Sequence, residues 1–170
     1  MITLLLILFQ IMTTVLLTIL FPLYVLFIIW ANNKSIPHSI SDSWYILGSK
    51  KPILKYLFTV WCYVIGALIL SYSSDDSFLY FLGGMGMFWV GTYTYFKIKK
   101  TENEYIHFAG AALTILSCLV ALAISKIYFP LIVMVIGTPI TYLLTKKNKT
   151  HIFWVEILAF ACIIIGLWLK

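Results

Sequence analysis

The feature that most constrains this chain is a series of long apolar runs separated by short polar segments. A helix needs roughly 20 mainly apolar residues to cross the hydrocarbon of a bilayer. The runs cover residues 2–30, 55–71, 78–96, 106–125, 128–144 and 151–169. With 62% hydrophobic and 11% charged residues, a water-soluble globule would have no place for so much apolar surface. We therefore predict an all-α polytopic membrane protein, a single bundle of about six transmembrane helices spanning residues 1–170.

The segment between the first two runs, residues 31–54, is the longest polar stretch. Ser39 followed three residues later by Asp42 resembles a capping box and predicts the start of a short helix. Gly48 can end this helix. One apolar face would contain Ile40, Trp44 and Leu47. We expect the helix to lie in the membrane interface, anchored by Trp44 and Tyr45.

The basic residues indicate topology. All twelve are lysines, and the absence of arginine argues against nucleic acid as a partner. Ten lysines fall after the first, third and fifth runs: Lys34, Lys50, Lys51, Lys55, Lys97, Lys99, Lys100, Lys146, Lys147 and Lys149. The other side has Lys126 and Lys170. This bias predicts lysine-rich cytoplasmic loops, with both termini outside the cell membrane. The first run exceeds the apolar length of a signal peptide, so we expect it to be retained as a span.

The polar residues inside or beside the runs are the candidates for function. In this topology His38, His107 and His151 share one side of the membrane with Asp42. Glu156 lies about one helical turn inside the last run. A carboxylate in hydrocarbon is costly and normally has a partner, which would be His107, His151 or a lysine unless Glu156 reaches water near the headgroups. The three cysteines, Cys62, Cys118 and Cys162, are expected to be apolar packing residues.

Two short stretches resemble known families. Residues 36–42 (IPHSISD) follow the first run, and residues 107–111 (HFAGA) open the fourth. This arrangement resembles the six-span family that includes the DRAM autophagy modulators and the GPI-lipid remodelling factors. A more distant likeness is to the CREST membrane hydrolases, which include alkaline ceramidases and use zinc at the cytoplasmic leaflet. That likeness would give roles to Ser39 or Ser41, Asp42, His107 and His151.

Three functions are compatible with the sequence. The leading hypothesis is a non-enzymatic protein, without a cofactor, that binds lipid or a membrane protein partner, including a second copy of the chain. Its cytoplasmic-leaflet site would contain His38, Ser39, Ser41, Asp42, Trp44, His107, His151 and Glu156. The second is a zinc-dependent lipid hydrolase, with metal ligands drawn from His38, His107, His151 and Asp42. The third is a small proton-coupled transporter in which Glu156 titrates and a stripe of Gln10, Thr14 and Thr18 lines a path.

Overall fold

The computed structural model describes residues 2–73, 78–94 and 102–170, with side chains for all of these except 2 and 102–104. Every element in these ranges is helical. In chain order they are α1 (Ile2–Ala31), η1 (Ile40–Asp42), α2 (Ser43–Lys50), η2 (Pro52–Lys55), α3 (Tyr56–Leu70), α4 (Phe78–Thr92), α5 (Glu102–Ile124), α6 (Phe129–Thr145), η3 (Lys146–Asn148) and α7 (His151–Leu169). The prediction of an all-α fold is confirmed for the described ranges.

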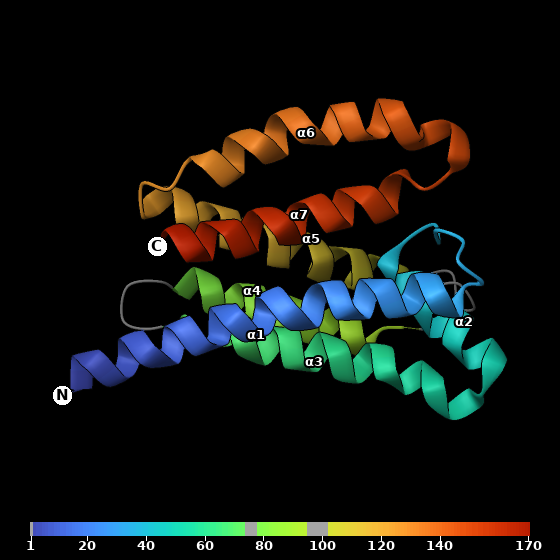
Figure 1. Ribbon diagram of the computed structural model, residues 1–170, viewed down its shortest axis with the longest axis horizontal. Coiled ribbons are helices and arrows are strands. Elements are labelled where there is room, and N and C mark those ends of the chain that lie inside the picture. The colour runs from blue at the N-terminus through green and yellow to red at the C-terminus, as the bar shows by residue number, and fades with distance from the viewer. Residues whose placement is uncertain (1, 74–77, 95–101) are drawn as a thin grey trace.

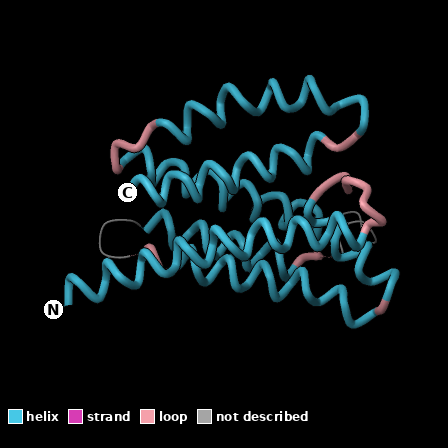
Figure 2. Tube along the Cα trace, viewed as in Figure 1, coloured by secondary structure: helices cyan, strands magenta, loops and turns pink. Residues whose placement is uncertain are grey.

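The long helices run side by side along one axis of the molecule (Figure 1). The N- and C-terminal ends lie at the same end of the bundle (Figure 1). The loops after α1 and after α6 lie at the opposite end, together with α2 (Figures 1 and 2). The expectation that the two termini share a side is therefore compatible with the fold. Lys97, Lys99 and Lys100 lie outside the described residues.

Five helical segments in the described ranges are long and apolar enough to cross a membrane: Thr3–Ala31, Pro52–Leu70, Tyr105–Ile124, Phe129–Asn148 and His151–Leu169. The sixth predicted span is represented by α4, an apolar helix of 15 residues. At 1.5 Å per residue α4 is about 22 Å long, shorter than the hydrocarbon core of a typical bilayer.

Glycines let α4 pack tightly between α3 and α5. A Cβ at Gly84 would lie 2.6 Å from the carbonyl oxygen of Gly66 on α3. A Cβ at Gly86 would lie 2.5 Å from the carbonyl oxygen of Gly110 on α5. Since these neighbours are backbone atoms, any side chain at either position would push the helices apart. The three helices therefore form the most closely packed part of the bundle.

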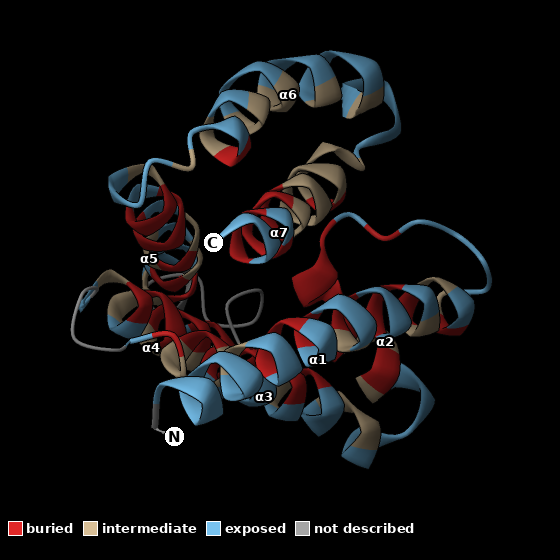
Figure 3. Ribbon diagram, turned by 60° about the vertical axis from the view of Figure 1, so that its left-hand side comes forward, coloured by how far each residue is buried: buried red, intermediate tan, exposed pale blue. Residues whose placement is uncertain are grey.

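The α6 helix stands apart from α1–α4 and packs mainly against α7 (Figure 3). Pro130 is its buried residue, while large apolar side chains such as Val135 and Leu144 are exposed. The N-terminal part of α1 is similarly exposed, from Leu4 to Met12. In a membrane protein, such exposed apolar surfaces would face lipid.

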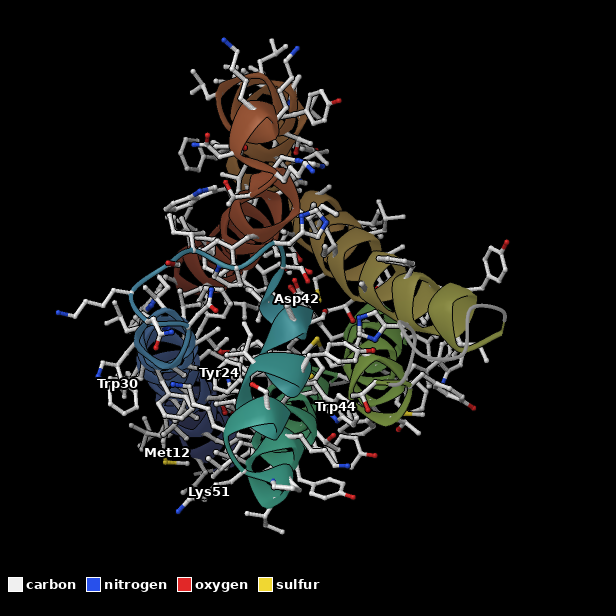
Figure 4. The ribbon with its side chains drawn as sticks, turned by 90° about the vertical axis from the view of Figure 1, so that its right-hand side faces the viewer. Met12, Tyr24, Trp30, Asp42, Trp44 and Lys51 are labelled. Carbon is white, nitrogen blue, oxygen red and sulfur yellow. The ribbon has the colours of Figure 1, made fainter. Side chains whose placement is uncertain are left out.

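The predicted short helix after α1 is present, and Ser39 caps η1 by accepting a hydrogen bond from the Asp42 amide at 3.2 Å. The sequence predicted that Gly48 could end this helix. It does not, because α2 continues to Lys50. Trp44 lies within the protein, with 5% of its surface exposed. Figure 4 views this end of the bundle. Asp42 lies near the middle of the end and Trp30 lies at its outside.

Aromatic rings fill the interior where α1, α3 and α7 meet. Tyr24 stacks on Trp61 with ring centroids 4.4 Å apart, and Phe21 stacks on Phe160 at 4.8 Å. The three cysteines are free and buried, which confirms the prediction that they pack as apolar residues. Trp61 and Phe160 of this cluster also line a pocket beside η1.

Candidate functional site

The loop after α1 is tied to the start of α7. The Phe153 amide donates to the His38 carbonyl at 2.9 Å. The His38 ring donates through Nδ1 to the carbonyl of Lys149, because a carbonyl oxygen can only accept. These two contacts turn the chain towards the centre of the bundle, where η1 begins.

Glu156 holds η1 in place from α7. Its Oε2 accepts a hydrogen bond from the Ile40 amide at 2.6 Å. The sequence suggested a histidine, a lysine or headgroup water as its partner, whereas the described partner is a backbone amide. A carboxylate that satisfies a backbone amide at the end of a loop removes one of the costs of placing irregular backbone inside a bundle.

Ser41, the residue after Ile40, contacts His107. Ser41 Oγ lies 2.9 Å from His107 Nε2, which reaches it from α5. The other ring nitrogen of His107 lies 3.1 Å from the carbonyl oxygens of both Val90 and Tyr93. Both Ser41 and His107 are buried.

A pocket with a cavity volume of about 40 Å³ lies beside η1 between α3, α4, α5 and α7. Its apolar lining includes Phe58, Met87, Val90, Ala111, Ile115 and Phe160. Its polar lining includes Ser41, Trp61, Thr114 and Glu156. The composition of this lining, mainly apolar with a few convergent polar groups, is the one that sites for small molecules and lipids have.

Trp61 contributes a hydrogen-bond donor that the described protein atoms leave unused. Its side chain is 8% exposed and lines the pocket, and Nε1 has no hydrogen-bond partner among the described residues. A buried donor left without a partner costs about 1–3 kcal/mol. Thr114, by contrast, already donates to the backbone, to the Gly83 carbonyl at 2.9 Å. Trp61 is therefore the lining group with most to gain from a ligand acceptor.

The three histidines lie at one end of the bundle, as predicted, but they do not converge on one point. His38 and His151 have ring centroids 5.6 Å apart, and His151 also contacts Tyr142 at 5.2 Å. His107 is instead engaged with Ser41, and both of its ring nitrogens have protein partners.

A zinc site does not fit the described side chains. In residues 2–73, 78–94 and 102–170, no group of three or more His, Cys, Asp or Glu side chains is placed to hold a metal ion. His38 Nδ1 is occupied by a backbone carbonyl, as is His107 Nδ1. We therefore derive no chemistry from zinc.

The remaining predicted site residues serve different contacts. Ser39 caps η1, and Trp44, a residue of α2, packs into the hydrophobic core. Asp42 is buried beside them. Ser43 shares a hydrogen bond of 2.8 Å with the hydroxyl of Tyr24, which ties α2 to α1. Of the predicted set, Ser41 and Glu156 line the pocket, and His107 stands directly behind Ser41.

The polar stripe of α1 makes contacts between helices near the opposite end. Thr14 shares a hydrogen bond with Tyr72. Tyr72 also donates to the Gln10 carbonyl at 2.8 Å, and Trp168 donates to Thr18 at 3.0 Å. These hydrogen bonds connect α1 to the end of α3 and to α7.

Comparisons with known proteins add no relative. A scan of protein-family models, a search of curated proteins and a search of solved structures each found no match. The family resemblances therefore stay expectations.

Proposed function

We propose that this chain is a multi-pass membrane protein that binds a lipid in the pocket beside η1. The apolar wall would hold part of an acyl chain, and a carbonyl of the lipid would accept the hydrogen bond that Trp61 Nε1 leaves unused. The single observation that carries the proposal is this buried donor, which has no partner among the described residues and belongs to a side chain that lines an apolar pocket. An acceptor there would relieve the cost of the unpaired donor.

The surroundings support an amphipathic ligand. Ser41 and Glu156 place polar atoms at the η1 side of the pocket, while Phe58 and Phe160 offer apolar surface. Seven described lysines lie in the segments at this end of the bundle: Lys34, Lys50, Lys51, Lys55, Lys146, Lys147 and Lys149. Lysines at a membrane surface attract anionic headgroups. The ligand class supported by these features is a lipid with a carbonyl linkage below an anionic headgroup.

The same proposal places the chain in the cell membrane with six crossings, α4 being the sixth. The lysine-rich end would face the cytoplasm, and both termini would face outward. Single-cysteine labelling at Lys50 and Lys147 tests this arrangement, with the three native cysteines replaced by serine or alanine. Both positions should react from the cytoplasmic side, and labelling from opposite sides would contradict the topology.

Lipid retention tests the binding site. The full chain, purified in a mild detergent, should carry a native lipid detectable by mass spectrometry. Ala111→Leu should reduce retention because its larger side chain fills the pocket. Ala112→Leu is the matched control, since Ala112 lies on the exposed side of the same helix. Equal retention in the two variants, or no lipid on the unaltered protein, would refute the proposal.

A further inference from the structure

The hydrogen bond between Ser41 and His107 has a defined direction. His107 Nδ1 lies 3.1 Å from two backbone carbonyl oxygens, those of Val90 and Tyr93. Carbonyl oxygens accept hydrogen bonds, so Nδ1 carries a proton. Burial of the His107 ring favours its neutral form, in which Nε2 has no proton. Nε2 is then an acceptor, and the Ser41 hydroxyl donates to it across 2.9 Å.

This direction is the one that activates a serine. A nucleophilic serine needs a base within hydrogen-bond reach and a third group that orients the base. Here the carbonyl oxygens of Val90 and Tyr93 orient the His107 ring. His107 is 2% exposed and Ser41 is 6% exposed, so water does not compete freely for either side chain. Ser41 also lines the pocket, whereas His107 is placed behind it.

We propose that Ser41 and His107 form a nucleophile–base pair that cleaves a carboxylic ester of the lipid bound in the pocket, an inference that rests on the proposed function. Ser41 Oγ attacks the ester carbonyl carbon while its proton passes to His107 Nε2. The C–O bond to the alcohol breaks, and His107 returns the proton to the departing alkoxide. The products are an alcohol and an acyl ester of Ser41.

Water completes the reaction. One water molecule gives a proton to His107 and attacks the acyl carbon, and the released Ser41 oxygen recovers the proton. The acid leaves and the serine is regenerated, so no oxidant or reductant is required. The chemistry is an acyl transfer to water through a covalent intermediate.

Two other pocket residues fit supporting tasks. Trp61 Nε1 is a buried donor without a protein partner in the described ranges, and such donors stabilise the oxyanion that forms on an ester carbonyl. Glu156 is a positioning residue, because its bond to the Ile40 amide fixes the residue before Ser41.

An alkyl fluorophosphonate tests the nucleophile directly. The folded full chain in detergent should form one adduct, and peptide mass spectrometry should locate it at Ser41. Ser41→Ala should abolish the adduct, and His107→Gln should slow its formation by about 100-fold or more, the usual contribution of a general base. Ser49→Ala is the matched control, since Ser49 is an exposed serine of α2 that bonds the Ile46 carbonyl. It should label as the unaltered protein does.

The outcomes separate this inference from lipid binding. Lipid retained by a protein whose Ser41 forms no adduct, and which gives no acyl-Ser41 with p-nitrophenyl octanoate, overturns the nucleophile while leaving the binding site intact. The nucleophile–base pair is also overturned if Ser41 reacts equally fast in His107→Gln and in the unaltered protein. His107 would then have only a structural role, through its hydrogen bonds. Because the adduct is located on the unaltered protein, the test does not depend on whether Ser41→Ala folds.

Discussion

Replacing Gly86 with alanine should weaken the packing of α4 against α5 and disturb the contacts of His107 in the candidate site. A Cβ at this position would lie 2.5 Å from the Gly110 carbonyl oxygen and 2.5 Å from Thr114 Oγ1. Ordinary contact begins at 3.4 Å, so the two helices must separate locally by about 0.9 Å. The carbonyl is backbone and cannot rotate out of the way.

This separation sets the size of the effect. Overpacking of a close-packed core costs about 1–3 kcal/mol. For a chain of this size, each kcal/mol lowers Tm by about 2–4 °C, which gives a decrease of about 2–12 °C. Val90 lies one turn after Gly86, and its carbonyl oxygen is 3.1 Å from His107 Nδ1. Adding the same displacement gives about 4 Å, beyond the range of a hydrogen bond.

The buried cysteines provide the assay. A thiol-reactive fluorogenic dye should react with Cys62, Cys118 and Cys162 only as the bundle opens, since all three are buried. Gly137→Ala is the matched control, because its Cβ would meet a methyl of Leu158, the end of a flexible side chain, at 2.8 Å. The packing argument would be refuted if Gly86→Ala had the same Tm as the unaltered protein. It would also be refuted if Gly137→Ala lowered Tm as much as Gly86→Ala does.

Variants at three further positions test individual contacts. Ser39→Ala removes the acceptor for the Asp42 amide and should cost about 1 kcal/mol, with Ser39→Thr restoring most of it in the same melting assay. Tyr72→Phe removes the hydroxyl that joins the end of α3 to α1 and should cost about 0.5–1.5 kcal/mol, while an unchanged Tm would show that this contact is not needed. Glu156→Leu should expose the Ile40 amide to faster hydrogen exchange because its acceptor is gone, whereas Glu156→Gln should keep it protected; equal exchange in both would contradict the assigned hydrogen bond.

The helices could be predicted from the sequence because each follows from its own run of apolar residues. The end of α4 could not. The run predicted a helix to residue 96, whereas α4 ends at Thr92. The Tyr93 carbonyl contacts His107, and the Thr94 carbonyl accepts from the Tyr45 hydroxyl at 3.0 Å. Side chains from α5 and α2 therefore capture the backbone at this point, and such distant contacts leave no trace in local hydropathy.

The site could be predicted only in part, because it also depends on contacts between residues that are distant in the sequence. Lysine bias and the cost of a buried carboxylate placed the histidines and Glu156 at one end of the bundle. The partner of Glu156 is a backbone amide, which has no sequence signature. Trp61 was missed, although a signal exists: tryptophan in membrane proteins favours the interface, and Trp61 lies more than one turn inside α3.

Backbone demands and the proposed chemistry converge on the same side chains. A loop that enters a membrane bundle must have its polar groups satisfied by protein. The loop after α1 meets this demand through the Phe153 amide and Glu156, and then delivers Ser41 to His107. Substitution of Glu156 or His107 therefore changes fold and function together. Ala111 lines the same pocket and its methyl side chain makes no hydrogen bond, so filling the pocket from that position separates ligand binding from the integrity of the loop.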